Sequence, residues 1–331
     1  MSIDYLFELG GENTDVAIYE LETVLECEEY NPRKLFNQQN TVTFNISKTL
    51  DEKTIARLGM TKRVSKVIYS FNNKDINEII DQIKEIDIGH KTFAIRMISR
   101  KMGDEQEIAV KLGAKISSKN EIDLENPQVK VLVFIGKKIM ITLNNNEIRT
   151  SYKDCLKNHV KYRPYFSPIS IHPRIARAMV NMSKCKEGDT IIDPFCGTGG
   201  ILIEGGKVGL NLLGLDILEK MVKNTNGNLK HFGLEGKIEQ GDVGCISKFD
   251  FSAIVCDPPY GLSTTTAGEE ISDLMVRTMN AFSESTKKGK RIVIAVSNPN
   301  IIPTESFTVI KNFEWYVHKS LTRNLLVLEK N

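Results

Sequence analysis

The sequence predicts an α/β protein whose C-terminal half is a parallel sheet with helices on both faces, preceded by a mixed α+β region. From residue 166 onward, short apolar runs alternate with helical segments, a pattern that favours parallel strands joined by helices. Upstream of that point, strands and short helices follow one another without this alternation. The change near residue 166 indicates that the two halves are separate regions.

The first half divides into two α+β stretches and a connecting segment. Residues 1–60 combine an expected strand at 3–9, an acidic helix, a strand at 41–46 and a short helix at 51–60. Residues 61–145 continue with strands at 64–71, 91–99, 129–135 and 137–143, and with helices at 75–87 and 105–116. The last two strands meet at Gly136, which is a hairpin signal. Residues 146–165 have weak periodicity, so we interpret them as a linker.

In the second half, residues 166–331, the expected elements follow in regular order. A helix begins near Pro173, a favoured first-turn residue, and has an apolar face that includes Ile175 and Met179. Seven strands are expected, at 190–193, 211–216, around Ile238, and at 252–256, 291–298, 306–310 and 324–329. Helices at 201–208, 218–232 and 271–286 lie between them. The last two strands close the sheet, which we expect to be mixed.

Length and composition exclude several classes of protein. A chain of 331 residues suggests two or three domains with ample core. No apolar run approaches the ~20 residues that a membrane helix needs, and the first residues lack the basic and apolar segments of a signal peptide. The six cysteines are scattered without a CxxC pair, so neither a metal site nor a disulfide framework is expected. We therefore expect a cytoplasmic protein without a metal, and a monomer is our working hypothesis.

The net charge of +2 conceals an uneven distribution. Residues 1–60 carry a net charge of −6, whereas residues 61–165 carry +7 and residues 166–331 carry +1. A basic middle region is a possible electrostatic footprint for nucleic acid. The plainer alternative is a solvated surface rich in lysine, and charge alone does not decide between the two.

The first candidate site is the stretch DPFCGTGG, residues 193–200, which follows an expected strand and precedes a helix. Ligands of open α/β sheets bind beyond the carboxyl ends of strands, and glycines there let the backbone approach a ligand. The stretch does not fit the dinucleotide pattern GxGxxG, because the third glycine position holds Leu202, and it lacks the GK[ST] of a phosphate loop. Asp193 before the glycines suits a ligand with positive charge, such as the amino group and sulfonium of S-adenosylmethionine (SAM). A tight strand–helix turn is the alternative.

Two further acids follow the next two strands. Asp216 ends the strand at 211–216, where a carboxylate can accept hydrogen bonds from ribose hydroxyls. Asp242 and Val243 follow the third strand, where a carboxylate can accept from an adenine amino group. Either acid alone is more often a helix N-cap. Three strand-end acids in series with a glycine loop favour a cofactor site instead.

The fourth strand ends in DPPY, residues 257–260. Methylation of an exocyclic amine is difficult because the nitrogen lone pair is delocalised into the ring. Asp257 and the backbone carbonyl of Pro258 can each accept one amino hydrogen, and the prolines make this backbone rigid. Tyr260 offers a face on which an extruded base can stack. The alternative is a proline-rich turn with a core tyrosine, which the upstream motifs make less attractive.

These motifs carry a resemblance to a known family. The second half resembles a class I SAM-dependent methyltransferase that modifies amino groups, whose signature is [D/N/S]PP[Y/F]. More closely, the runs FSPISIHPRIARAMVNM, IIDPFCGTGGILIEGG and CDPPYGLSTTTAGEE resemble the archaeal tRNA guanine-N2 methyltransferases that act at guanosine ten. The segments FAIRMISRK, AVKLGAKI and IDLENPQVKVLVFI resemble the THUMP domain of RNA-modifying enzymes, and residues 1–60 resemble the ferredoxin-like domain that precedes it.

The resemblance implies the whole domain organisation. A ferredoxin-like domain spans 1–60 and a THUMP RNA-binding domain spans 61–145. After the linker at 146–165 comes a Rossmann-like class I methyltransferase domain at 166–331, with a seven-stranded mixed sheet. SAM is then the cofactor and tRNA the partner, with no membrane.

The resemblance also implies residue roles. The methionine end of SAM is held by Asp193, Phe195, Gly197 and Gly199. Asp216 holds the ribose, and Asp242 with Val243 holds the adenine. The target guanine contacts Asp257, Pro258 and Tyr260, and the methyl group passes directly to N2, once or twice. Leu262 departs from the family pattern, which has a basic residue at this position.

Other functions stay open at this stage. A related enzyme could modify guanine N2 at another tRNA position or in rRNA. An amino-methylating DNA enzyme is less favoured, because a THUMP-like half indicates RNA. From another class, the chain could be a non-catalytic RNA-binding module, although an intact DPPY argues against it.

Overall fold

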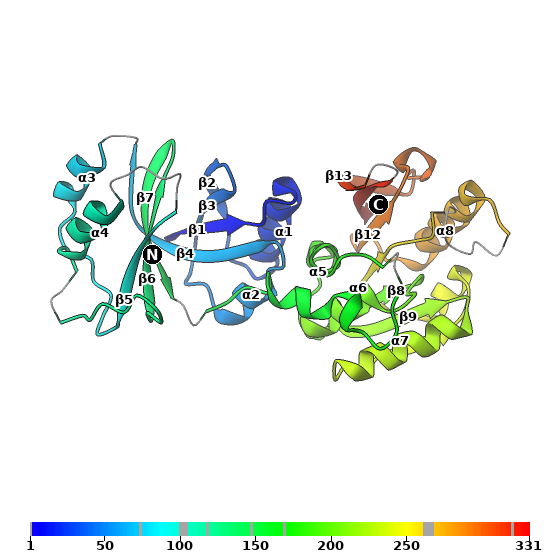
Figure 1. Cartoon of the computed structure of the whole chain (residues 1–331). Helices are drawn as coiled ribbons and strands as arrows, with labels where there is room; N and C mark the ends of the chain where they lie inside the picture. Colours follow the sequence, from blue (N-terminus) through cyan, green and yellow to red (C-terminus); the bar gives the residue numbers. More distant parts are fainter. Residues whose placement is uncertain are drawn as a thin grey trace. The chain divides into compact units, whose positions relative to one another are not determined.

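The computed structural model describes residues 2–72, 75–98, 105–116, 119–145, 148–167, 170–260, 268–318 and 321–331 (Figure 1). The chain forms two compact units. The first unit comprises Met1–Gly11, Glu29–Ala56 and Thr61–Thr150. The second comprises Glu12–Glu28, Arg57–Met60 and Ser151–Asn331.

The first unit is built on one seven-stranded sheet, in the order β2-β3-β1-β4-β7-β6-β5. Its strands are β1 (Ile3–Leu9), β2 (Arg33–Gln38), β3 (Thr41–Ile46), β4 (Thr61–Asn72), β5 (Phe93–Met97), β6 (Val129–Ile135) and β7 (Lys138–Asn145). Its helices are α2 (Glu52–Arg57), α3 (Ile76–Gln82) and α4 (Glu105–Gly113). Neighbouring strands are antiparallel except β5 and β6. Strands from both expected α+β stretches therefore belong to one sheet, in which β1 pairs with β4.

Apolar spacing explains how α3 and α4 cover part of this sheet. One face of α3 buries Ile76, Ile79 and Ile80, which are spaced by about one helical turn. On α4 the buried residues Ile108 and Leu112 have the same spacing. They pack in one cluster with buried residues of β5, β6 and β7. The helix expected at 75–87 ends earlier than predicted, at Gln82. The sequence analysis also missed β2, an edge strand whose residues RKLFNQ lack apolar alternation because they are mostly exposed.

The second unit is built on another seven-stranded sheet, in the order β10-β9-β8-β11-β12-β14-β13. Its strands are β8 (Thr190–Asp193), β9 (Asn211–Asp216), β10 (Lys237–Gln240), β11 (Ala253–Cys256), β12 (Arg291–Val296), β13 (Phe307–His318) and β14 (Leu321–Lys330). The first five strands of this order are parallel, and β14 runs antiparallel between β12 and β13. The seven-stranded mixed sheet predicted from the sequence is therefore confirmed.

Helices connect the parallel strands as the alternation predicted (Figure 1). They are α6 (Gly200–Lys207), α7 (Glu219–His231) and α8 (Ile271–Ser285), with the 3-10 turn η3 (Val243–Lys248) between β10 and β11. The helix α5 (Pro173–Met182) and the 3-10 turns η1 (Asp154–Asn158) and η2 (Val160–Tyr162) precede β8, and the turn η4 (Pro299–Ile301) follows β12. Pro173 is at the start of α5, as expected. Buried residues of α8, including Met279 and Phe282, pack against β11 and β12 in one core cluster. Within the described ranges, no helix has the length and apolar character needed to cross a membrane.

The second unit also contains α1 (Thr14–Cys27), which packs on α5 through buried polar groups. Glu20 of α1 is fully buried, and burial raises its pKa. Its carboxylate accepts hydrogen bonds from Gly59 N at 2.9 Å, Met60 N at 2.8 Å and Asn181 Nδ2 at 2.7 Å. A helix from the first 30 residues is thus part of the same compact unit as the C-terminal sheet.

Candidate active site

The predicted acids converge at one edge of the second sheet. Asp193 is the last residue of β8 and Asp216 the last of β9, while Asp242 and Asp257 follow β10 and β11 within two residues. The four strands are neighbours and run parallel, so their carboxyl ends lie side by side. The topology therefore brings all four carboxylates to the same edge.

Asp193 is the most deeply buried of the four, with 2% of its surface exposed. Its Oδ1 accepts a hydrogen bond from Phe195 N at 3.0 Å, which starts the turn into the glycine loop. Burial raises the pKa of Asp193 well above its usual value, and the neighbouring carboxylates of Asp257 and Asp216 raise it further. A cationic ligand group would relieve this accumulation of buried acid.

The loop that follows contains two glycines in a backbone conformation that favours glycine. Gly197 and Gly199 have φ angles of 54° and 81°, in the left-handed region. A Cβ on Gly199 would stand 3.0 Å from Cγ2 of Thr225, a residue of α7. The hydroxyl of Thr225 holds the loop from that side by donating to Gly197 O at 2.8 Å. The sequence analysis did not identify Thr225, since nothing in its surroundings links it to the loop.

Asp216 ties the glycine loop to the next strand. Its Oδ2 accepts from Gly197 N and its Oδ1 from Leu218 N, each at 2.9 Å. Burial raises its pKa. A carboxylate has about four lone-pair sites, so roughly two remain for ligand hydroxyls.

Asp242 caps the 3-10 turn η3, which is the alternative that the sequence left open. Its Oδ1 accepts from Gly244 N at 2.9 Å and pairs with Arg277 of α8. Although burial opposes it, the hydrogen bond from Arg277 lowers the pKa of Asp242. Both bonds use Oδ1, which leaves Oδ2 as an acceptor. Val243 is buried in the core cluster beneath.

The DPPY motif leaves β11 at this same edge. The side chain of Asp257 is 15% exposed and Pro258 is buried. The Tyr260 hydroxyl donates to Asp257 Oδ1 and accepts from Arg323 Nε at 3.1 Å. Burial raises the pKa of Asp257, and the nearby charge of Arg323 and the Tyr260 hydroxyl act against that rise. Pro258, Pro259 and Tyr260 also line a small pocket of about 10 Å³.

Arg323 is a site residue that the sequence analysis missed. It lies near the start of β14, and its Nη2 is 3.5 Å from Asp257 Oδ2. Because β14 is antiparallel to β12, its beginning reaches the edge where the parallel strands end. An arginine beside the apolar run NLLVLE is a signal that a buried carboxylate lies nearby. Leu262, where the sequence departs from the family pattern, is outside the described residues.

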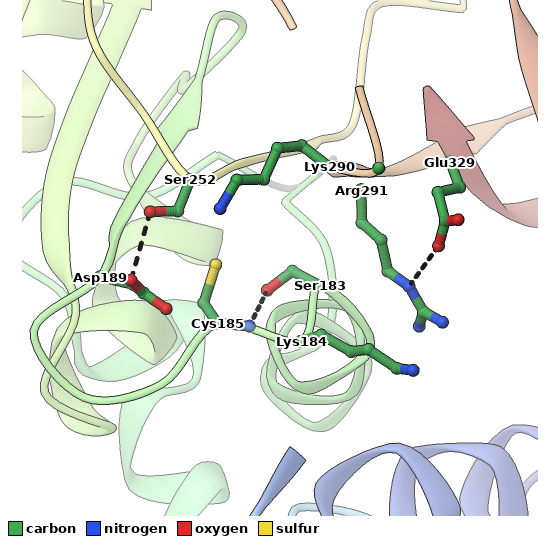
Figure 2. A pocket seen from close by; sticks show the side chains of 9 residues that line it. Ser183, Lys184, Cys185, Asp189, Ser252, Lys290, Arg291 and Glu329 are labelled. Carbon is green, nitrogen blue, oxygen red and sulfur yellow. Dashed lines mark hydrogen bonds and ion pairs between the residues drawn. The ribbon is translucent and has the colours of Figure 1, made fainter. Parts of the chain in front are cut away.

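A larger cavity lies at the opposite edge of the sheet, where the parallel strands begin (Figure 2). It measures about 220 Å³ and is lined by Ser183, Lys184, Cys185, Asp189, Ser252, Gly289, Lys290, Arg291 and Glu329. Its polar groups contact one another: the Ser252 hydroxyl donates to Asp189 at 3.3 Å, and Arg291 Nε is 3.8 Å from Glu329. None of the predicted site residues lines it.

The carboxyl edge fits SAM on its own geometry. Among the described residues, a Cβ on Gly197 would have only Phe195 O within 4 Å, at 3.9 Å, so a ligand can approach the backbone there, and buried Asp193 suits the cationic methionine end. Asp216 retains acceptor capacity for ribose hydroxyls. Fold and site together define a class I SAM-dependent methyltransferase, with a DPPY motif suited to an amino-group target.

Comparison with known proteins supports the assignment as a methyltransferase. Residues 160–304 match the family of RMKL-like methyltransferase domains. A tRNA (guanine(10)-N2)-dimethyltransferase from Methanothermobacter thermautotrophicus is 33% identical over 288 residues, covering 83% of this chain and 84% of that protein. Another, from Methanocaldococcus jannaschii, is 29% identical over 360 residues, covering 98% and 99%. The crystal structure of TrmN from Thermus thermophilus has a TM-score of 0.58 at 15% identity, covering 99% of this chain and 100% of that one. The chain belongs to the tRNA (guanine(10)-N2)-dimethyltransferase family.

Proposed function

We propose that this protein transfers methyl groups from SAM to N2 of guanosine ten in tRNA, giving N2-methylguanosine and then N2,N2-dimethylguanosine. The observation that carries the proposal is the partly buried Asp257 of DPPY, near Asp193 at the carboxyl edge of the sheet. The target position comes from the family, because the archaeal relatives are named as dimethyltransferases of guanine ten in tRNA.

In this proposal, one group of residues holds the cofactor. These are Asp193, Phe195, Gly197 and Gly199 at the methionine end, Asp216 at the ribose, and Asp242 with Val243 at the adenine. When bound, the cofactor supplies an activated methyl group on a sulfonium. Asp242 accepts the adenine amine through Oδ2, because Oδ1 is bonded to Gly244 N and Arg277.

The target amine is held by Asp257 and by the carbonyl of Pro258, each accepting one N–H. Arg323 favours the ionised form of Asp257, which is the form that accepts hydrogen bonds. In this structure the Tyr260 hydroxyl donates to the same carboxylate. The entering base therefore displaces the Tyr260 hydroxyl and stacks on its ring. As the N–C bond forms, the bond between the methyl carbon and the sulfonium sulfur would break, and the N2 proton would pass to the carboxylate of Asp257 and from there to solvent.

The first methyl group need not end the reaction. After one transfer, N2 keeps one hydrogen, which rotation brings to Asp257 or to the Pro258 carbonyl. A second transfer is then possible at the same site.

The basic middle of the chain supports a role in holding tRNA. We propose a ferredoxin-like domain at 1–60, a THUMP domain at 61–145, a linker at 146–165 and the methyltransferase domain at 166–331. The net charge of +7 over residues 61–165 favours phosphate contacts, so tRNA affinity should fall steeply with salt. A shallow salt dependence would argue against this assignment.

We further propose that the enzyme works in the cytoplasm as a monomer. All six cysteines are free thiols, which suits a reducing compartment. Sedimentation equilibrium would test the monomer.

The test of the function is to incubate the protein with labelled SAM and a tRNA, then digest the tRNA and analyse its nucleosides by mass spectrometry. The proposal predicts mono- and dimethylguanosine from a tRNA with guanosine ten, and neither from the same tRNA carrying adenosine ten. Equal product from both tRNAs would favour another target position. No product from any tRNA or rRNA, with intact RNA binding, would favour the non-catalytic alternative.

A further inference from the structure

Arg163 is a buried arginine with unused hydrogen-bond donors. Only 5% of the residue is exposed. Its Nε donates to Asn158 O at 2.9 Å, but neither Nη1 nor Nη2 has a hydrogen-bond partner in the described part of the chain. Buried charged groups are normally paired, because leaving one unpaired is strongly unfavourable.

The nearest buried acid does not satisfy Arg163. Glu204 of α6 is fully buried and attracts the guanidinium electrostatically. Its oxygens, however, are bonded to Arg177 at 2.8 Å and to Asn158 Nδ2 at 2.9 Å. Burial lowers the pKa of Arg163, and the attraction of Glu204 only partly opposes this change. Arg177 is thus a matched case, because it is similarly buried but pairs with Glu204.

The position of Arg163 suggests which ligand would engage it. Its Nη1 stands 3.2 Å from the point where a Cβ on Gly200 would lie. Gly200 is the first residue of α6 and directly follows the glycine loop. The first N–H groups of a helix lack intrahelical partners and favour negative charge. An unpaired guanidinium beside a helix start forms a site for a small anion, most naturally a carboxylate.

We infer that Arg163 binds the carboxylate of the methionine part of SAM. The inference rests on the proposed function, which puts that part of the cofactor at the glycine loop. It also changes the role of residues 146–165, which the sequence analysis interpreted as a linker. From that segment Arg163 supplies a positive charge that, among the residues described, is not already paired with a carboxylate of the edge.

The test compares two ligands and three proteins by calorimetry. The ligands are S-adenosylhomocysteine and its analogue without the carboxyl group. Wild type should bind the analogue about 10- to 100-fold more weakly, the range for hydrogen bonds between charged groups. Arg163→Met should bind both ligands with nearly equal affinity. Arg163→Lys should keep part of the discrimination, since it retains the charge but not the planar fork.

Thermal unfolding without ligand separates this role from a structural one. Arg163→Met should keep or raise the melting temperature, because it removes an unpaired buried charge. The control Arg177→Met should lower it, because it leaves Glu204 buried and unpaired.

Two results would overturn the inference alone: wild type that binds both ligands equally, or Arg163→Met that discriminates as wild type does. In the first case the anion at Arg163 would have another source, such as an RNA phosphate. Failure of wild type to bind S-adenosylhomocysteine at all would overturn the proposed function as well.

Discussion

The two edges of the second sheet differ in a way that cavity size does not reveal. The edge where the parallel strands begin holds the larger cavity, about 220 Å³, in which Ser252 pairs with Asp189 and Arg291 with Glu329. The carboxyl edge includes a small pocket beside Pro258 and Tyr260, and it concentrates carboxylates with raised pKa values, left-handed glycines and the guanidinium of Arg163. The clustering of carboxylates with raised pKa values at the ends of neighbouring parallel strands, rather than cavity volume, marks the functional edge.

The largest expected effect comes from removing the carboxylate at DPPY. Asp257→Ala should lower the rate of methyl transfer by ~10²–10³-fold, since the amine loses an acceptor that orients it. Affinity for SAM should stay within a few-fold, because Asp257 is proposed to contact the target base only. Single-turnover kinetics and calorimetry measure the two quantities, and near-normal turnover would remove Asp257 from the reaction.

A smaller effect is expected at the ribose acceptor. Asp216→Ala should weaken SAM binding by ~1.5–3 kcal/mol, the range for hydrogen bonds to a charged group. Asp216→Asn is the matched control, because it keeps an acceptor oxygen. Unchanged affinity of the alanine variant by calorimetry would mean that Asp216 only organises the loop through Gly197 and Leu218.

The pH dependence tests the missed residue, Arg323. Methyl transfer requires ionised Asp257, so the rate falls as pH drops through its pKa, which burial raises and Arg323 opposes. Arg323→Met removes that opposition, so the acid limb of kcat should move to higher pH, whereas Arg323→Lys should move it less. A pH–rate profile in which the acid limb of Arg323→Met coincides with that of wild type would contradict this role.

The smallest effect is expected at the opposite edge. Lys290 extends across the cavity in Figure 2 but touches none of the proposed machinery. Lys290→Met should change kcat and SAM affinity by less than about twofold, within the usual range for substitutions away from special features. A loss comparable to that of Asp216→Ala would show that the larger cavity takes part in the reaction.

The sequence was informative where chemistry and pattern coincide along the chain. Apolar runs that end in Asp193 and Asp216 predicted both the strands and the acids of the site. It was less informative where neighbours in space are distant in sequence. Arg323 meets Asp257 only because β14 returns antiparallel beside β12, and Arg163 reaches Gly200 from a segment with weak periodicity.

Strand β2 was missed for a different reason, because an exposed edge strand needs no apolar alternation. The buried Glu20 of α1 accepts hydrogen bonds from the backbone N–H groups of Gly59 and Met60, within the second unit. These contacts leave no local sequence pattern either.

The most direct test of the central claim is a crystal structure of the protein with S-adenosylhomocysteine. The account predicts the ligand at the carboxyl edge, with ribose hydroxyls on Asp216, its methionine end along Gly197 and Gly199, and its sulfur facing Asp257. Ligand density in the cavity lined by Asp189, Ser252 and Lys290, with none beside Asp216, would contradict it.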